Sequence, residues 1–517
     1  MRGLLLLWAC AVTLLFWWWF QRDHVIDWPS FAIASLALIW VVCLPAYFFF
    51  FLLRARVPNP RLAVGSGWRV AMVVTKAPSE PFSVVQETLM GMLSQRYPHD
   101  TWIADEDPSP ETLDWCRRHG VKVSCRKDHP EYHRSSWPRR RRCKEGNLAF
   151  FYDHFGYRDY DFVVQMDADH IPQESYLEEM LRPFGDPEVG YVSAPSVCDS
   201  NAAESWSARA RLYGEALFHG ALQAGYTNGF APVCIGSHYA VRTRALTEIG
   251  GLGPELAEDH STTLFMNAAG WRGVHAIQAR ARGQGPQTFA NMAVQEFQWS
   301  RSLVRILLFH TPYLWKNLPR RLKAQFLFSQ LWYPMFSLSM LLLFVMPIVA
   351  LIRGQAWVDI RFPDFIAFFS ATYISSVAIL FWTLNRRLSR PSRFSLFSWE
   401  AMLFPMVKWP WVLLGFLAAV LDRLGKTDFE FKVTPKQSSP SEGLGCLRFA
   451  IPYIALSLAA AAPVLVVAHA GNASGSYLFS SLNAVTYGIC FSTILVENCW
   501  SKISRKHTNQ GQLATAG

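Results

Sequence analysis

The feature that most constrains the fold is the grouping of apolar residues into runs of about twenty, the length of a helix that crosses a bilayer. Six of these runs contain few or no charges. They lie at residues 4–20, 31–53, 326–352, 365–384, 449–468 and 477–496. Residues 65–321 contain no run of that length. The sequence therefore predicts a soluble domain inserted between two groups of membrane-spanning helices.

A seventh apolar stretch, residues 396–421, is interrupted by Glu400, Pro405, Lys408 and Pro410. Each charged residue would cost roughly 2.5–3.5 kcal/mol if it were placed in hydrocarbon. We therefore expect an interfacial or broken helix here. Six spans remain, two before the domain and four after it.

Basic residues indicate the orientation of these spans. They follow the second span, follow the fourth span and close the chain: Arg54, Arg56, Arg61, Arg386, Arg387, Arg390, Arg393, Lys502, Arg505 and Lys506. The positive-inside rule places all of them, and the soluble domain, in the cytoplasm. The net charge of +10 fits these loops and requires no nucleic-acid partner.

These features divide the chain into six predicted segments. They are two N-terminal transmembrane helices (1–64), the cytoplasmic domain with interfacial helices (65–325), two transmembrane helices (326–385), an interfacial helix and a loop (386–445), two transmembrane helices (446–500) and a cytoplasmic tail (501–517).

Strand and helix patterns alternate within the domain. A strand pattern at residues 68–75 is followed by a break and by a helical pattern at residues 82–95, and similar cycles follow. This alternation predicts a parallel α/β sheet, whose ligands bind beyond the carboxyl ends of the strands. Acidic residues stand at such ends: Asp105 closes one strand, and Asp167 and Asp169 close another.

Asp167 and Asp169, in "VVQMDADH", are two residues apart and therefore project to the same side of an extended chain. Two such carboxylates can share a hard cation, Mg²⁺ or Mn²⁺, whose remaining ligands are commonly substrate phosphates. A D-x-D pair by itself is more often a turn or a cap at the end of a strand.

Further motifs follow in a fixed order. They are "AED" with Glu258 and Asp259, "QEFQWSR" with Gln295, Trp299 and Arg301, and "FKVTPK" at residues 431–436. The set resembles the processive family 2 glycosyltransferases, which are cellulose- or curdlan-synthase-like membrane polysaccharide synthases. The resemblance implies a multi-pass α-helical protein of the bacterial inner (plasma) membrane with an inserted cytoplasmic α/β domain of the GT-A (Rossmann-like) class.

The resemblance also implies a role for each matching residue. Asp259 would be the catalytic base, with Glu258 beside it, and Asp167 and Asp169 would hold the Mg²⁺ or Mn²⁺ ion. The nucleotide sugar would be bound by Thr75, Glu80, Asp105, Lys144, Asp167, Gln295, Arg301, Thr434 and Lys436. The acceptor would meet Trp299, Gly236 and Ser237. Phe431 and Val433 would belong to a gating loop that closes over the nucleotide.

Two motifs depart from the family pattern. Ala257 replaces the Thr of "TED", and Gln298 replaces the Arg of "QxxRW". The second change removes a cation that would face phosphate, and we expect Arg301 or Arg305 to compensate for it.

The function implied is that of an inverting hexosyltransferase which polymerises UDP-glucose into a β-glucan and exports it. The expected partners are the UDP-sugar, the growing polysaccharide, the lipid bilayer and periplasmic or regulatory subunits. Three alternatives stay open. They are a hyaluronan- or chitin-type synthase that uses UDP-N-acetylglucosamine, a non-processive polyprenyl-phosphate glycosyltransferase, and a transporter or channel with a noncatalytic domain.

Overall fold

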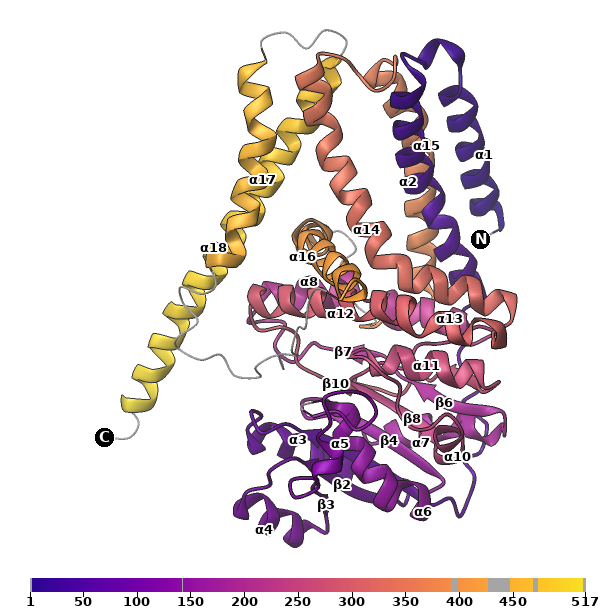
Figure 1. Cartoon of the computed structure of the whole chain (residues 1–517), viewed down its shortest axis with the longest axis vertical. Helices are drawn as coiled ribbons and strands as arrows, with labels where there is room; N and C mark the ends of the chain where they lie inside the picture. Colours follow the sequence, from indigo (N-terminus) through magenta and orange to yellow (C-terminus); the bar gives the residue numbers. More distant parts are fainter. Residues whose placement is uncertain (1, 142, 392–397, 426–446, 468–472, 515–517) are drawn as a thin grey trace.

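The computed structural model describes residues 2–141, 143–391, 398–425, 447–467 and 473–514. The predicted gating-loop and lid residues Phe431, Val433, Thr434 and Lys436 lie outside these ranges. Figure 1 shows three levels along the long axis of the molecule: a sheet domain, a layer of helices lying across it, and long helices that rise away from both. The fold predicted from the sequence, a multi-pass helical membrane protein with an inserted α/β domain, is confirmed.

The domain is built on a seven-stranded sheet with the order β3-β2-β1-β4-β8-β6-β9. Its strands are β1 (Val70–Lys76), β2 (Asp100–Asp105), β3 (Lys122–Ser124), β4 (Phe162–Asp167), β6 (Val189–Ser193), β8 (His238–Arg242) and β9 (Arg272–His275). Three short strands, β5 (Ile171–Pro172), β7 (Ser196–Val197) and β10 (Ala281–Arg282), form a second sheet. The domain helices include α3 (Phe82–Leu93), α4 (Pro110–His119), α5 (Lys144–Phe151), α7 (Tyr176–Leu181), α10 (Thr243–Glu248) and α11 (Glu258–Ala268).

The main sheet differs from the predicted parallel sheet in one strand. β8 runs antiparallel to both β4 and β6, with Met166 opposite His238. Because it is antiparallel, β8 begins where β4 ends. The loop residues Gly236 and Ser237 are thereby brought beside Asp167, at the carboxyl end of β4.

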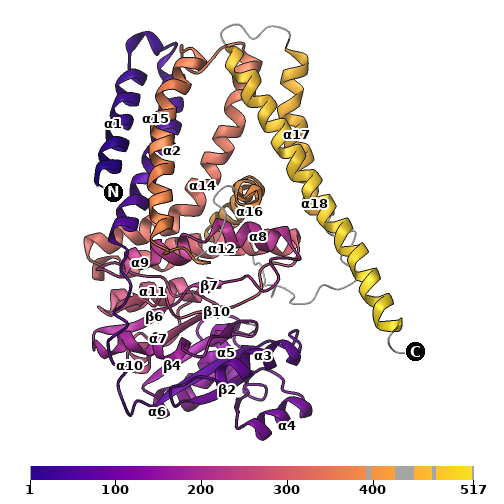
Figure 2. The ribbon, with the colours of Figure 1, turned by 180° about the vertical axis from the view of Figure 1, so that it is seen from behind.

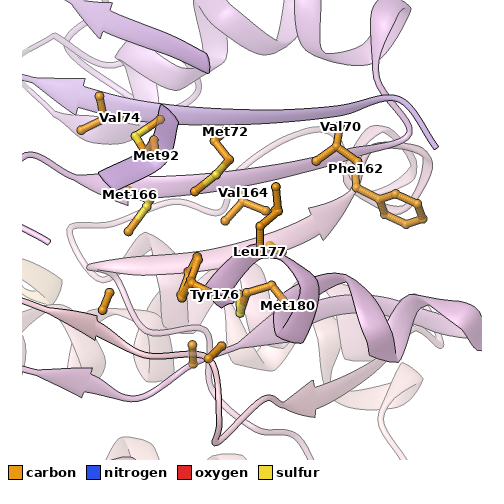
Figure 3. Close-up of a cluster of buried hydrophobic side chains, with 14 of the residues drawn as sticks. Val70, Met72, Val74, Met92, Phe162, Val164, Met166, Tyr176, Leu177 and Met180 are labelled. Carbon is orange, nitrogen blue, oxygen red and sulfur yellow. The ribbon is translucent and has the colours of Figure 1, made fainter. Parts of the chain in front are cut away.

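An apolar core fixes the central strands. Figure 3 shows side chains of β1 and β4, such as Met72 and Val164, in one cluster with residues of α7 such as Leu177. All three side chains are fully buried. Burial of this kind stabilises the fold by about 1.5–3 kcal/mol for each large apolar side chain. This core therefore fixes the position of the strand ends that carry the polar residues.

Seven helices among the described residues are long and apolar enough to cross a membrane. They are α1 (Arg2–Trp19), α2 (Trp28–Arg54), α14 (Arg320–Arg353), α15 (Phe362–Asn385), α16 (Trp399–Arg423), α17 (Leu447–Val466) and α18 (Ser474–Ala514). Such helices have all their backbone groups bonded internally, as hydrocarbon requires. The chain is therefore a membrane-embedded protein.

The helix α16 has a different direction from the other six. Figures 1 and 2 both show it nearly end-on, crossing the layer formed by α8 (Trp206–Gly214), α12 (Phe289–Phe309) and α13 (Thr311–Leu314). Three of its charged residues are paired with that layer: Glu400 with Arg209 of α8 at 2.8 Å, Lys408 with Glu296 of α12 at 3.7 Å, and Asp422 with Arg301 of α12 at 2.7 Å. Such pairing offsets the cost of placing these charges in an apolar helix. Because α16 is also long and apolar enough to cross a membrane, its assignment as an interfacial helix stays a prediction, as do the domain boundaries.

Two contacts hold α16 against α12 of this layer. Ser300 of α12 donates a hydrogen bond of 2.7 Å to the carbonyl of Val412, and Gly415 of α16 packs on the α12 backbone where a Cβ would clash. On the other side, Glu497 of α18 accepts hydrogen bonds from Ser205, Ser207 and the backbone N–H of Phe289. These donors lie at the first turns of α8 and α12, where a carboxylate is favourable. One transmembrane helix therefore caps both layer helices.

Candidate active site

Three segments of the domain meet at the carboxyl end of β4. Lys144, the first residue of α5, donates hydrogen bonds of 2.7 Å to Asp167 Oδ1 and 2.6 Å to the carbonyl of Gly236. The backbone N–H of Asp167 donates to the carbonyl of Ser237 at 2.7 Å. One cluster is thus formed by Lys144, Asp167, Gly236 and Ser237. These residues are up to 93 positions apart in the sequence. About a third of the Asp167 side chain stays exposed, so the cluster is open to a ligand.

Asp259, the second residue of α11, is joined to the same cluster through Gly236. The Gly236 N–H donates to Asp259 Oδ2 at 2.8 Å, and the N–H of His260 donates to Oδ1 at 2.7 Å. A Cβ at position 236 would lie 3.1 Å from Asp259 Oδ2. Glycine at this position therefore permits the close approach that orients the carboxylate.

Burial raises the pKa of both acids at the start of α11. For Glu258, the neighbouring Asp259 charge adds to the effect of burial, and its Oε1 atom is buried without a hydrogen-bond partner. For Asp259, the N–H groups of His260 and Gly236 and the Lys144 ammonium offset burial in part, and the net pKa is still raised. A carboxylate with a raised pKa is a better proton acceptor than an ordinary one.

The rate of the reaction at this site should therefore depend on pH. Asp259 must be ionised to accept a proton, and its raised pKa keeps it protonated to a higher pH than usual. We expect the rate at saturating substrate to fall on acidification through an apparent pKa above ~3.9, the ordinary value for Asp. Initial rates measured from acidic to neutral pH test this. An acidic limb at or below the ordinary value would contradict the assignment.

Asp167, Asp169 and His170 form a possible cation site. Each of the three residues has one ligand atom that lies within 4.8 Å of the ligand atoms of the other two residues. Asp169 Oδ1 lies 3.1 Å from His170 Nδ1, and Ser196 Oγ lies 3.1 Å from His170 Nε2. Burial lowers the pKa of His170, but the charge and hydrogen bond of Asp169, together with the Cys198 thiol, outweigh burial and raise the pKa to about 10. His170 therefore donates to Asp169 and holds its carboxylate in place. Two carboxylates beside an open position suit Mg²⁺ or Mn²⁺.

The other predicted nucleotide-sugar residues lie at the adjacent strand ends. Asp105 is fully buried, and Lys76 of β1 lies 3.1 Å from its carboxylate. Thr75 donates a 3.5 Å hydrogen bond to the carbonyl of Met166, and Glu80 accepts a 2.8 Å hydrogen bond from Ala77 within the turn after β1. The structure thus brings these residues to the edge of the cluster, with their side chains engaged in internal contacts.

The segment before α5 is folded against the domain. The buried guanidinium of Arg126 donates to the carbonyls of Tyr132 and Arg140 at 2.8 Å, and Glu145 accepts from the backbone N–H groups of Arg139 and Arg140. Among the residues described here, the basic run at positions 139–141 is therefore part of the structure that positions Lys144. A Cβ at Gly146 would overlap the Arg140 carbonyl and the Arg126 side chain.

Gly146→Ala is accordingly expected to destabilise the protein by about 1–3 kcal/mol, the usual cost of forcing a methyl group into a filled space. The matched control is Gly185→Ala, because a Cβ at Gly185 would meet nothing within 4 Å. Thermal unfolding of the detergent-solubilised variants measures the difference. Equal melting temperatures of Gly146→Ala and Gly185→Ala would contradict this prediction and show that the segment around Arg140 moves aside without a cost in stability.

Gln295 and Trp299 lie on the same face of α12, one turn apart, and both contact Arg211 of α8. Arg211 Nη1 donates to Gln295 Oε1 at 3.1 Å, and its guanidinium carbon lies 4.4 Å from the centroid of the Trp299 ring. This pair and Arg211 form what we call the α8–α12 wall.

Arg301 and Arg305, the residues expected to compensate for Gln298, both contact Asp422 of α16. Arg301 Nε lies 2.7 Å from Asp422 of α16, and Arg305 bridges Asp422 at 3.0 Å and Glu255 at 2.8 Å. The Asp422 contacts join α12 to the end of α16, and the Glu255 contact joins α12 to the loop before α11.

Sequence reasoning missed Lys76, His170 and Arg211. His170 directly follows the D-x-D pair, and Lys76 ends the strand beside Asp105, so position alone could have drawn attention to both. Arg211 stands in a helix without a motif. Its place beside Trp299 depends on the packing of α8 against α12 and could not have been read from the sequence.

Comparison with known proteins gives a consistent result. A model for the family described as "Glycosyl transferase family group 2" matches residues 162–356, which include Asp167, Asp259 and Trp299. The cellulose synthase catalytic subunit [UDP-forming] of Pseudomonas fluorescens (strain SBW25) is 26% identical over 259 residues, covering 48% of this chain and 33% of the relative. Cellulose synthase 1 catalytic subunit [UDP-forming] of Komagataeibacter xylinus is 25% identical over 274 residues, covering 51% of this chain and 34% of the relative.

The match thus spans about a third of the length of these relatives. Among solved structures, a mannosyltransferase from Pyrobaculum calidifontis in complex with GDP-Man and Mn²⁺ has a TM-score of 0.46 and 16% sequence identity. The match covers 76% of this chain and 99% of that one.

Proposed function

We propose, from the premise that this chain contains a family 2 glycosyltransferase domain and is cellulose-synthase-like, that it is a processive, inverting membrane polysaccharide synthase. Its donor would be a UDP-sugar, UDP-glucose before others, and its product a β-glucan that leaves between the membrane helices. The observation that carries the proposal is the cluster in which Gly236 joins Lys144 and Asp167 to Asp259.

Asp259 is the group that accepts the proton of the acceptor hydroxyl as this oxygen attacks the anomeric carbon. Inverting transfer requires a carboxylate within hydrogen-bond reach of that hydroxyl. Its two backbone hydrogen bonds fix the carboxylate, and its raised pKa suits it to the task. Glu258 is buried behind it and helps to set the charge of the pair.

Lys144 and Asp167 form the donor side of the site. The Lys144 ammonium is a fixed cation at the position where the leaving diphosphate gains negative charge, and such preorganised charges stabilise the transition state. Thr75, Glu80 and Asp105 border the nucleotide, with Asp105 held by Lys76. Thr434 and Lys436 would add phosphate contacts from the gating loop.

Asp167 and Asp169, with His170 beside them, would hold a divalent ion, Mg²⁺ or Mn²⁺. The fit rests on their ligand atoms, which lie within 4.8 Å of one another and are mostly carboxylate oxygens. When bound, the ion would neutralise charge on the diphosphate. His170 keeps Asp169 oriented through its hydrogen bond of 3.1 Å.

The acceptor side is the α8–α12 wall. The Trp299 indole offers a flat apolar face to the C–H surface of a sugar, and Gln295 offers an amide to its hydroxyls. The basic clusters support a cytoplasmic domain in a bacterial inner membrane, since they fall on one side of the predicted spans. Periplasmic or regulatory subunits remain expected partners through the resemblance.

The proposal is tested with purified protein in lipid nanodiscs containing Mg²⁺ or Mn²⁺. Radiolabel from UDP-glucose and, separately, from UDP-N-acetylglucosamine is followed into insoluble polymer and into lipid extract. Polymer from UDP-glucose that β-glucanase digests is the expected result. Polymer from UDP-N-acetylglucosamine alone would move the assignment to the hyaluronan or chitin type. Label in lipid alone, or no transfer, would overturn the synthase proposal.

A further inference from the structure

Arg211 of α8 is a partly buried cation in the α8–α12 wall. Its side chain is 15% exposed, and it has three partners at once: Glu215 at 3.2 Å, Gln295 at 3.1 Å and the ring of Trp299 at 4.4 Å. A guanidinium stacked on an aromatic ring is attracted by the negative ring face and prefers a parallel, planar contact. Arg211 therefore restricts the orientation of both side chains that face it on α12.

The charges around Arg211 hold it in place. Burial raises the pKa of Glu215, but Arg211, His219 and Lys408 together lower it more, to about 2. His219 adds a second contact to Glu215 at 3.3 Å. Burial lowers the pKa of Arg211, but Glu215, Cys198 and Glu296 together raise it more. The Arg211–Glu215 pair is thus ionised at neutral pH.

No other guanidinium or ammonium among the described residues contacts the Trp299 ring. Position 298, adjacent to Trp299 and one turn from Gln295, is a glutamine. The nearby Arg301 and Arg305 are tied to Asp422. The fixed cation on this face of α12 is therefore supplied from a different helix.

We propose that Arg211 is the positioning residue of the acceptor site: it locks Trp299 and Gln295 in the orientation that aligns the terminal sugar with Asp259. The inference rests on the proposed function. A displaced acceptor leaves water as the competing nucleophile, and misplacement by about 1 Å can cost ~100-fold in rate. Loss of Arg211 should therefore affect transfer to sugar more than cleavage of the donor.

The experiment compares Arg211→Gln and Arg211→Lys with the wild-type protein in nanodiscs. UDP release and labelled polymer are measured in the same reaction, and their ratio is the readout. We expect Arg211→Gln to lower polymer formation by ~10- to 100-fold while UDP release falls much less. Arg211→Lys keeps the charge and loses the planar face, so a smaller shift in the same direction is expected.

The matched control is Arg209→Gln. Arg209 lies on the same helix and pairs with Glu400 of α16 at 2.8 Å, so its loss weakens the docking of α8 without touching Trp299. Its ratio of polymer to UDP should equal that of the wild type. A ratio unchanged in both Arg211 variants, or changed equally in Arg209→Gln, would overturn the inference. Absence of polymer from the wild type would instead reject the proposed function. If Arg211→Gln does not fold, Arg211→Lys carries the same test.

Discussion

Asp259→Asn is expected to lower the rate of glycosyl transfer by ~100- to 10,000-fold, the usual contribution of a general base. The amide cannot accept the hydroxyl proton, yet it occupies nearly the same volume as the carboxylate. Donor affinity should stay within a few-fold of the wild type, since Asp259 contacts Gly236 and His260 rather than the Lys144–Asp167 pair. Turnover and UDP affinity are measured separately, and the expected result is a large fall in turnover with nearly unchanged UDP affinity.

The fold should survive this substitution. Because burial raises the pKa of Asp259, its ionised form destabilises the protein at neutral pH, and a neutral amide relieves that cost. Loss of one of the two backbone hydrogen bonds to this side chain would lower the stability by about 0.5–1.5 kcal/mol and so oppose that gain. The melting temperature should therefore change little. Asp114→Asn, on the exposed face of α4, is the control that should leave turnover unchanged. Substantial transfer by Asp259→Asn would remove Asp259 from the role of base.

Asp169→Asn is expected to weaken Mn²⁺ binding by at least ~10- to 100-fold, the range seen when even supporting residues of a metal site are lost. Asp169 contributes one of two carboxylates in the Asp167–Asp169–His170 cluster. His170→Ala should weaken binding less, because His170 holds the Asp169 carboxylate by a hydrogen bond. Titration of Mn²⁺ followed by electron paramagnetic resonance reports binding without requiring turnover.

Chelation should abolish transfer by the wild-type protein, and added Mg²⁺ or Mn²⁺ should restore it. The matched control is Asp107→Asn, since Asp107 follows a neighbouring strand but pairs with Lys127 at the surface. Its Mn²⁺ affinity should equal that of the wild type. Wild-type affinity in Asp169→Asn, or transfer that resists chelation, would contradict the metal site.

Local sequence was sufficient where a single strand or helix decides the outcome. The apolar runs predicted the long helices, and the alternation of strands and helices predicted the order β1, α3, β2, α4. Asp167 and Asp259 could be singled out because each belongs to a short motif, and the resemblance to family 2 glycosyltransferases that these motifs carried is confirmed. The roles of the individual site residues stay predictions.

Packing decided what the motifs could not. The sequence predicted that Arg301 or Arg305 would compensate for the missing motif arginine, and this stays a prediction. The structure adds that both contact Asp422, because α16 lies across α12 and brings that carboxylate to them. Arg211 reaches Trp299 for the same kind of reason: α8 and α12 are held together at their first turns by Glu497 of a distant helix.

The sequence by itself determined the membrane helices, the α/β domain and the acidic strand ends, because each depends on the hydrophobic period or on residues adjacent in the chain. Only the tertiary structure decided the antiparallel direction of β8, the hydrogen bonds by which Gly236 joins Lys144 to Asp259, and the contact of Arg211 with Trp299. These contacts join residues between 23 and 92 positions apart. At such separations side-chain packing, which has no local signature, fixes which groups meet.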